Sequence, residues 1–230
     1  MSDPFQVVRD FEKALCEYTG APYCVTTTSC TTALLLAVKW QIKDGNWKQG
    51  FPRALIDIPT RTYVGVPMSI IHAGGKPTFR DEDWSGAYRL NPLPIWDSAR
   101  RFRRGMYAER SVWDPRHSPF AGPYPHPAPS EYGEMVCLSF HWSKTLGIEQ
   151  GGAILHSDPE ADRWLRMARF DGRQEGVNPK DQKDWILGYH AYMAPETAAK
   201  GLMRLSLLKG DEPDLPNSDY PDLSQLEIFK

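Results

Sequence analysis

The chain has 230 residues, of which 41% are hydrophobic and 24% charged, a composition that suits one α/β domain with a substantial core or at most two small domains. The formal charge of −2 gives no general attraction toward nucleic acid or membrane surfaces. No apolar run approaches the roughly 20 residues of a membrane span, and residues 1–4 lack the basic region of a signal peptide, so neither is expected.

The cysteines occupy apolar segments and lack the CxxC spacing of a zinc site; they are Cys16, Cys24, Cys30 and Cys137. We therefore expect reduced thiols rather than disulfides, as in a cytoplasmic protein of a cell or of an infected host cell. No metal is expected.

The first predicted element is a helix over residues 3–18, where apolar residues recur at helical spacing before Gly20 ends it. A short β-prone run over residues 23–27 leads into a hydroxyl-rich turn, residues 29–32, and then an apolar helix. Such a strand, turn and helix suit a phosphate site, because backbone amides and the positive helix end face the anion. The same residues equally suit a plain N-terminal cap.

Two further strands are predicted, over residues 54–59 and 93–99, with a helix from about residue 65 to 72 after the first. The second strand contains Asp97, which on the sequence alone also suits the cap of a following helix. Arg100 opens a basic cluster that suits a phosphorylated substrate, a nucleic-acid backbone or simply a solvated face.

Proline shapes two other segments. Six prolines within residues 114–129 exclude a helix or a central strand and predict an extended loop, either a substrate or partner loop or a linker. Aspartate and proline dominate from Gly210 onward, so residues 210–230 are predicted to form an extended tail.

A lysine lies between two predicted strands in the segment that carries most of the chemistry. A β-rich run ends at Ser139-Phe140-His141, Lys144 follows, and Gly151-Gly152 opens the next strand. Ligand sites of α/β folds lie at the carboxyl ends of strands, and an amine there suits Schiff-base chemistry. The alternative is a solvated loop lysine, since most lysines are exposed.

Together these segments resemble the DegT/StrS-type sugar aminotransferases, fold-type-I enzymes that use pyridoxal 5′-phosphate (PLP). Lys144, with the residues just before it and with Leu146-Gly147 and Gly151-Gly152-Ala153 after it, resembles the family's Schiff-base segment, and four other segments match in the family's order. The resemblance implies a three-layer α/β/α fold with a mostly parallel sheet. It also implies a shortened PLP-binding domain over residues 1–209 and a homodimer with the site at the subunit interface.

The resemblance also implies roles for individual residues. Lys144 forms the Schiff base and then acts as a base, Asp97 holds the pyridinium nitrogen of PLP, and Tyr63 stacks on the ring, although on the sequence alone Tyr63 equally suits the core. The phosphate is held by Cys30, Thr31 and Ser139. Cys30 replaces a glycine of the family, which requires a negative φ at this position. Candidates for substrate binding are Arg100, His141, His190 and Tyr192.

The chain departs from the family's pattern in length. It lacks an additional α/β unit before Asp97, most of the segment before the first helix, and a counterpart of the C-terminal small domain after Leu208. We therefore expect a more open site, in which a partner subunit or the proline-rich loop excludes water.

Three functions remain open at this point. The first is an aminotransferase acting on an amino donor such as glutamate and on a keto-sugar nucleotide. The second is a PLP-dependent decarboxylase, or another PLP reaction, on an amino acid attached to a large carrier such as a hypermodified viral DNA base, because an open cleft with an arginine cluster suits a bulky substrate. The third is a non-catalytic scaffold, against which the retained lysine, aspartate and aromatic residue argue.

Overall fold

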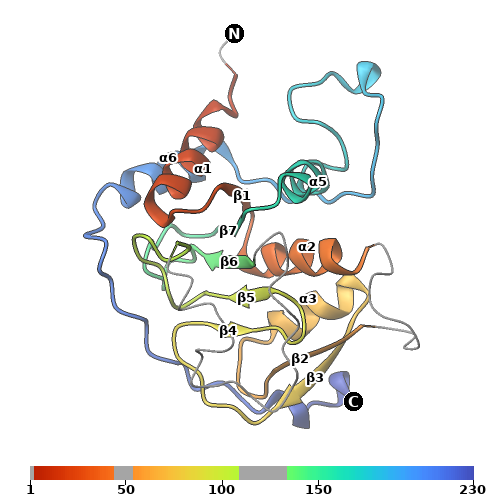
Figure 1. Ribbon diagram of the computed structural model, residues 1–230, viewed down its shortest axis with the longest axis vertical. Coiled ribbons are helices and arrows are strands. Elements are labelled where there is room, and N and C mark those ends of the chain that lie inside the picture. Colours follow the sequence, from red (N-terminus) through yellow and green to blue (C-terminus); the bar gives the residue numbers. More distant parts are fainter. Residues whose placement is uncertain (1–2, 44–53, 109–133) are drawn as a thin grey trace.

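The computed structural model describes residues 3–43, 54–108 and 134–230, and a five-stranded sheet lies at its centre (Figure 1). A smaller, two-stranded sheet lies beyond one edge of it, and the proline-rich loop at residues 114–129 falls outside the described residues. In spatial order the large sheet consists of β1 (Tyr23–Thr27), β7 (Gly152–His156), β6 (Met135–Ser139), β5 (Ile95–Asp97) and β4 (Tyr88–Arg89), and the small sheet of β2 (Leu55–Pro59) and β3 (Lys76–Arg80).

The helices of the described chain are α1 (Gln6–Thr19), α2 (Cys30–Ile42), α3 (Gly65–Ala73), α5 (Pro159–Arg169) and α6 (Pro195–Leu205), with short 3-10 helices η2 (Pro179–Asp181), η3 (Leu223–Gln225) and η4 (Glu227–Phe229). Within these residues, none of the helices has the length and apolar character needed to cross a membrane. The predicted end of the first helix is confirmed: Gly20 has φ of 80° and its amide bonds Cys16 O.

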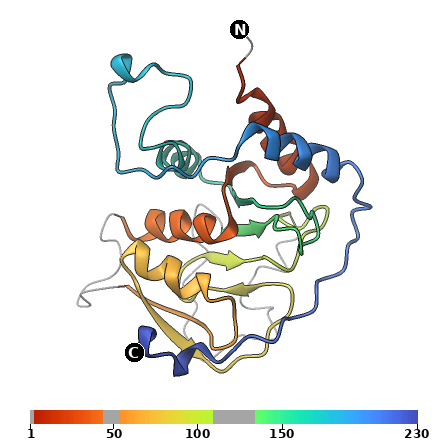
Figure 2. The ribbon, with the colours of Figure 1, turned by 180° about the vertical axis from the view of Figure 1, so that it is seen from behind.

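The sheet separates two layers of helices, because successive side chains of a strand point to opposite faces. In β6, Val136 and Leu138 pack in one core cluster with α1 and α6, whereas Met135 and Cys137 pack in another with α2, α3 and α5. Figures 1 and 2 show α1 and α6 side by side and α2 beside α3. The predicted α/β class and its three layers are confirmed.

The sheet is mixed, which corrects the expectation that it would be mostly parallel. In the large sheet only β5 and β6 run parallel, while β1–β7, β7–β6 and β5–β4 are antiparallel; β2 and β3 are also parallel. Residues 140–151 turn from β6 into β7 and residues 90–94 join β4 to β5, and neither connection contains a helix. A parallel pair needs a crossover connection, usually a helix.

The predicted C-terminal tail is extended and packs along the body of the protein. It leaves α6, runs down one side of the molecule and ends beside β3 (Figure 2). Leu223 is fully buried and its amide donates to Thr60 O at 2.9 Å, while the rings of Phe79 and Phe229 lie 5.8 Å apart.

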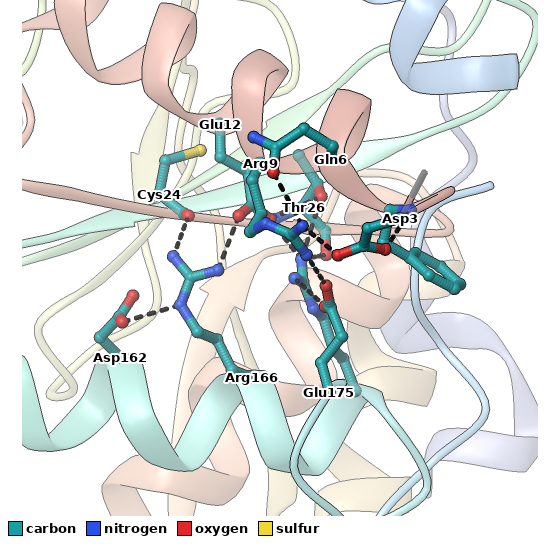
Figure 3. Close-up of polar contacts among 11 residues, drawn as sticks. Asp3, Gln6, Arg9, Glu12, Cys24, Thr26, Asp162, Arg166 and Glu175 are labelled. Carbon is teal, nitrogen blue, oxygen red and sulfur yellow. Dashed lines mark hydrogen bonds and ion pairs between the residues drawn. The ribbon is translucent and has the colours of Figure 1, made fainter. Parts of the chain in front are cut away.

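A buried ion network joins the two helical layers around the β1 edge of the sheet (Figure 3). Glu12 of α1 accepts hydrogen bonds from Arg169 and, at 2.6 Å, from Arg166, both in α5. Its carboxylate also accepts from the amide and the hydroxyl of Thr26 in β1, at 2.9 and 2.8 Å. Burial raises the pKa of Glu12, but the charges of Arg169 and Arg166 outweigh it and lower that pKa to about 2.

Glu12→Gln is expected to reduce the free energy of unfolding by about 3 kcal/mol, because it removes the nearer counter-charge of the buried guanidinium of Arg169 and leaves only Glu175, at 3.5 Å. Equilibrium denaturation in urea measures this loss. Glu17→Gln is the matched control, because Glu17 is exposed on the same helix and pairs only loosely with Lys13, at 3.9 Å.

The effect of Glu12→Gln should depend on pH. The pKa of Glu12 is lower in the folded chain than in the unfolded chain, so its stabilisation is complete above about pH 5 and is lost as the pH falls toward 2. The stability difference between wild type and Glu12→Gln should therefore shrink between about pH 6 and pH 3. A constant difference over that range would contradict the assignment.

Candidate active site

The register of the sheet brings the ends of β1, β6 and β5 and the start of β7 to the same end of the sheet, which we call the site edge. Thr27 at the end of β1 lies opposite Gly152 at the start of β7, and Gly152 lies opposite Ser139 at the end of β6. Asp97 ends β5 opposite Cys137, and β5 runs parallel to β6. Ligand sites of α/β folds form at such edges.

Lys144 sits in a tight turn after β6. Its amide donates to His141 O at 2.8 Å, and the turn closes where Phe140 N donates to Gly151 O at 2.9 Å. Leu146 is buried in the core below, and Gly147 takes φ of 61°, a conformation that favours glycine. These anchors fix the position of the lysine.

A cavity of about 620 Å³ opens at this edge, within the roughly 300–1,000 Å³ typical of small-molecule sites. It is lined by most of the residues that the sequence singled out, namely Cys30, Thr31, Tyr63, Asp97, Arg100, Ser139, His141 and Lys144. Lys144 and Asp97 thus line one cavity. Tyr63 is 55% exposed, so it does not pack in the core.

Asp97 is the buried carboxyl group of the cavity, 5% exposed. The hydroxyl of Tyr88 donates to one carboxylate oxygen at 2.8 Å, and the amide of Ala99 donates to the other at 3.0 Å. Burial raises the pKa of Asp97 above its ordinary value, against the opposing effects of these two donors and of the positive charge of Lys144. Asp97 is thus held by two donors in the same cavity as Lys144.

The N-terminus of α2 forms another wall. Ser29 caps the helix and accepts from Thr32 N at 3.1 Å, which is the plain N-terminal cap that the sequence allowed. The first intrahelical bond runs from Ala33 N to Ser29 O, which leaves the amides of Cys30 and Thr31 before it, at the positive end of the helix. Cys30 lies within α2 and is not among the described residues with positive φ, as its replacement of a glycine requires.

Two glycines shape this wall: one lets β7 approach the start of α2, and the other leaves space beside the helix end. A Cβ at Gly152 would lie 2.5 Å from the backbone nitrogen of Cys30, so only glycine lets β7 approach the start of α2. A Cβ at Gly65 would lie 2.6 Å from Tyr63 Cε1 and 2.8 Å from Thr31 Oγ1, so the missing side chain leaves space between these two residues.

Two of the four predicted substrate residues, His141 and Arg100, line the cavity, and the other two do not. His141 is exposed at the cavity, and its Nδ1 lies 2.9 Å from Ser143 Oγ. Arg100 also lines the cavity, but it is 6% exposed and its guanidinium bonds to the C-terminal segment.

His190 and Tyr192 do not line this cavity, so the structure does not bring them to the other site residues. The ring of Tyr192 packs against those of Phe5 and Phe170, and His190 bonds Asp171 at 3.0 Å. These contacts hold both side chains outside the cavity, although the backbone between them lies beside the end of β1, where Thr28 N donates to Ala191 O at 3.0 Å.

Sequence reasoning missed two contributors to the site. Tyr88 and its partner Thr62, 2.6 Å apart through their hydroxyls, support Asp97, and residues 215–218 and 220 of the tail line the cavity. A tyrosine directly opposite a strand-end aspartate is a signal only after the register of β4 and β5 is known.

This fold, with its cavity at the carboxyl edge, is that of the large domain of fold-type-I aminotransferases. The chain belongs to the DegT/DnrJ/EryC1/StrS aminotransferase family, which it matches over residues 3–93 and 128–211. The predicted family is confirmed.

Curated relatives are distant and longer. GDP-perosamine synthase of Caulobacter vibrioides is 24% identical over 218 residues, which is 85% of this chain and 55% of the relative. Spore coat polysaccharide biosynthesis protein SpsC of Bacillus subtilis is 24% identical over 233 residues, which is 87% of this chain and 57% of the relative. The chain therefore spans little more than half the length of these relatives.

Solved structures share the fold at low identity. AtS13 of Actinomadura melliaura has a TM-score of 0.63 at 20% identity, covering 87% of this chain and 59% of its own. A DegT DnrJ EryC1 StrS aminotransferase of Brucella abortus has a TM-score of 0.61 at 20% identity, and the match covers 88% of this chain and 58% of the other. NtdA of Bacillus subtilis, solved with bound cofactor PMP, has a TM-score of 0.60 at 18% identity, and the match covers 89% of this chain and 48% of the other.

Tyr88→Phe is expected to lower the free energy of unfolding by about 1.5–3 kcal/mol at neutral pH, because a buried carboxylate loses a donor. The loss also raises the pKa of Asp97 further, so the cost appears as the pH rises through that pKa and fades in acid, where the carboxyl is protonated. Urea denaturation at several pH values measures both effects.

Tyr18→Phe is the matched control for this prediction. It removes another tyrosine hydroxyl that bonds a carboxylate, Glu212 at 2.9 Å, but that carboxylate is only half-buried and lies outside the cavity. An equal cost for both variants at every pH would contradict a special role for the Tyr88–Asp97 bond.

Proposed function

We propose that this protein is a PLP-dependent aminotransferase in which Lys144 holds the cofactor as a Schiff base. It would take an amino group from a donor such as glutamate and pass it to a keto-sugar nucleotide or a similar acceptor. The observation that carries the proposal is the placement of Lys144 and the buried Asp97 in one cavity, beside the N-terminus of α2.

The residues present fit the chemical groups of PLP. Asp97 offers a buried anion for a protonated ring nitrogen, and its pKa, raised by burial, responds to nearby positive charge. The amides at the start of α2 and the hydroxyl of Ser139 suit the phosphate. Bound PLP supplies an electron sink for charge that develops at the substrate Cα.

The chain's own groups perform the other tasks. The amine of Lys144, positioned by its turn, is the group that moves the proton at the substrate Cα. Tyr63, exposed in the cavity across the gap left by Gly65, is placed to cover one face of a planar ring.

The proposal of a sugar-nucleotide acceptor is supported only by sequence similarity to named relatives. One relative is named GDP-perosamine synthase and another is a spore coat polysaccharide biosynthesis protein, and both belong to sugar metabolism by name. We extend that substrate class to this chain as part of the proposal.

A homodimer with the cavity at its interface is also part of the proposal. Trp142 is 70% exposed next to the cavity residue His141, and Tyr63 is exposed at the cavity as well. Large aromatic side chains exposed beside a cavity suit coverage by a second copy. We further propose that the protein acts in the cytoplasm, in keeping with its free cysteines.

Nothing in the arginine cluster favours a nucleic-acid-linked substrate over a free one. Arg100 bonds the tail, Arg101 pairs with Asp214 at 2.6 Å, and Arg104 lies over the ring of Tyr18. Decarboxylation of a carrier-linked amino acid therefore remains an outcome of the test below.

Wild type incubated with PLP is expected to develop a visible absorbance band, and borohydride reduction should fix the mass of the cofactor on the Lys144 peptide. Lys144→Ala should lose both signals, because the amine that bonds the cofactor is gone. Lys13→Ala, an exposed lysine on α1, is the matched control. A protein that gains no band with PLP would support the scaffold hypothesis instead.

Glutamate then separates the reaction types. For an aminotransferase, single-turnover mixing with glutamate should convert the bound cofactor to its amine form and release 2-oxoglutarate. A band that persists with glutamate, together with carbon dioxide released from another amino acid, would identify a decarboxylase.

A further inference from the structure

The C-terminal segment closes one side of the candidate active site. We call residues 214–220 the strap. Five of its residues line the same cavity as Lys144 and Asp97, and all five are uncharged: Leu215, Pro216, Asn217, Ser218 and Tyr220. The segment reaches this position from α6 along the side of the molecule (Figures 1 and 2).

Arg100 holds the strap from inside the cavity. Its guanidinium donates to Pro216 O, to Ser218 Oγ and, at 3.0 Å, to the hydroxyl of Tyr220. Its carbonyl accepts from Leu215 N at 2.8 Å. Its Nε is buried and has no hydrogen-bond partner among the described residues. Most of the donors of this arginine are thus turned toward the strap.

Independent contacts fix the strap outside the cavity. Asp214, which does not line the cavity, forms a bidentate pair with Arg101 through bonds of 2.9 and 2.6 Å. The side-chain amide of Asn217 donates to Trp84 O, and beyond the strap Leu223 is buried. The strap is therefore held at both ends, with Arg100 in the middle.

We propose that the strap is the substrate-facing wall of the active site and that Arg100 is the positioning residue that holds it, rather than a binding group for a substrate anion. This inference rests on the proposed function. The strap carries neutral polar groups. The hydroxyls of Ser218 and Tyr220 accept from Arg100 and keep their O–H donors, and the Asn217 amide, whose nitrogen donates to Trp84 O, keeps its carbonyl oxygen. Such groups suit a hydroxylated ring such as a sugar, and not a second anion.

Two variants separate the strap from a substrate role of Arg100. Arg100→Ala removes the internal anchor, while Asp214→Asn loosens the same segment from outside the cavity and leaves Arg100 in place. Asp214 is about one-fifth exposed, so this second variant keeps the test valid if Arg100→Ala fails to fold. Arg163→Ala, an exposed arginine on α5, is the control.

The first measurements use the full chain without PLP. Hydrogen exchange of peptides covering residues 212–223 should accelerate about tenfold in both variants, because charge-assisted hydrogen bonds are lost. Reductive methylation of Lys144, followed by mass spectrometry, should accelerate as well, because the cavity opens. Unchanged exchange and unchanged labelling in both variants would overturn the anchoring role of Arg100 and the strap.

The next measurement uses glutamate as the probe with PLP-loaded enzyme. Both variants should change the dependence of cofactor conversion on glutamate concentration in the same direction. If Arg100→Ala alone raised the half-saturating glutamate concentration tenfold while Asp214→Asn matched wild type, Arg100 would be a carboxylate-binding residue and the proposal would be wrong. Failure of wild type to convert at all would contradict the proposed function, whereas exchange and labelling would still decide whether Arg100 holds the strap.

Discussion

The pairing of β5 with β6, in parallel, is the constraint on which the candidate site depends. It sets the end of β5 beside the end of β6, so that Asp97 and the turn carrying Lys144 open onto one edge. The antiparallel return of β7 then brings Gly152 against the start of α2, whose helix end completes the cavity. A shift of one residue in either pairing would turn these side chains to the opposite face.

Burying a carboxylate at this edge has a cost that the neighbouring residues offset. The hydroxyl of Tyr88 and the amide of Ala99 donate to Asp97, and Lys144 contributes opposite charge. The buried carboxylate of Glu12 is stabilised differently, by hydrogen bonds from two arginines of α5 and from Thr26. In Glu12 the neighbours outweigh burial and lower the pKa; in Asp97 burial prevails and the pKa is raised. The two arginines of α5 thus keep Glu12 charged inside the protein, whereas burial works against the charged form of Asp97.

The strap forms one wall of the cavity that holds Lys144 and Asp97. An open site admits water, which weakens every electrostatic interaction within it. Residues that the family resemblance does not cover therefore supply part of the site, and Arg100, which resembles a substrate-binding group in the sequence, belongs structurally to that wall.

The sequence by itself determined the α/β class, the family and the main helices and strands, because apolar periodicity and short motifs are local. It also placed Asp97 at the end of a strand and Lys144 between two strands. Only the tertiary structure decided the mixed pairing of the sheet, the support of Asp97 by Tyr88, the removal of His190 and Tyr192 from the cavity, and the strap over it. These features join residues far apart in the chain, whose partners depend on register and on which layer each segment covers, and neither is written in local sequence.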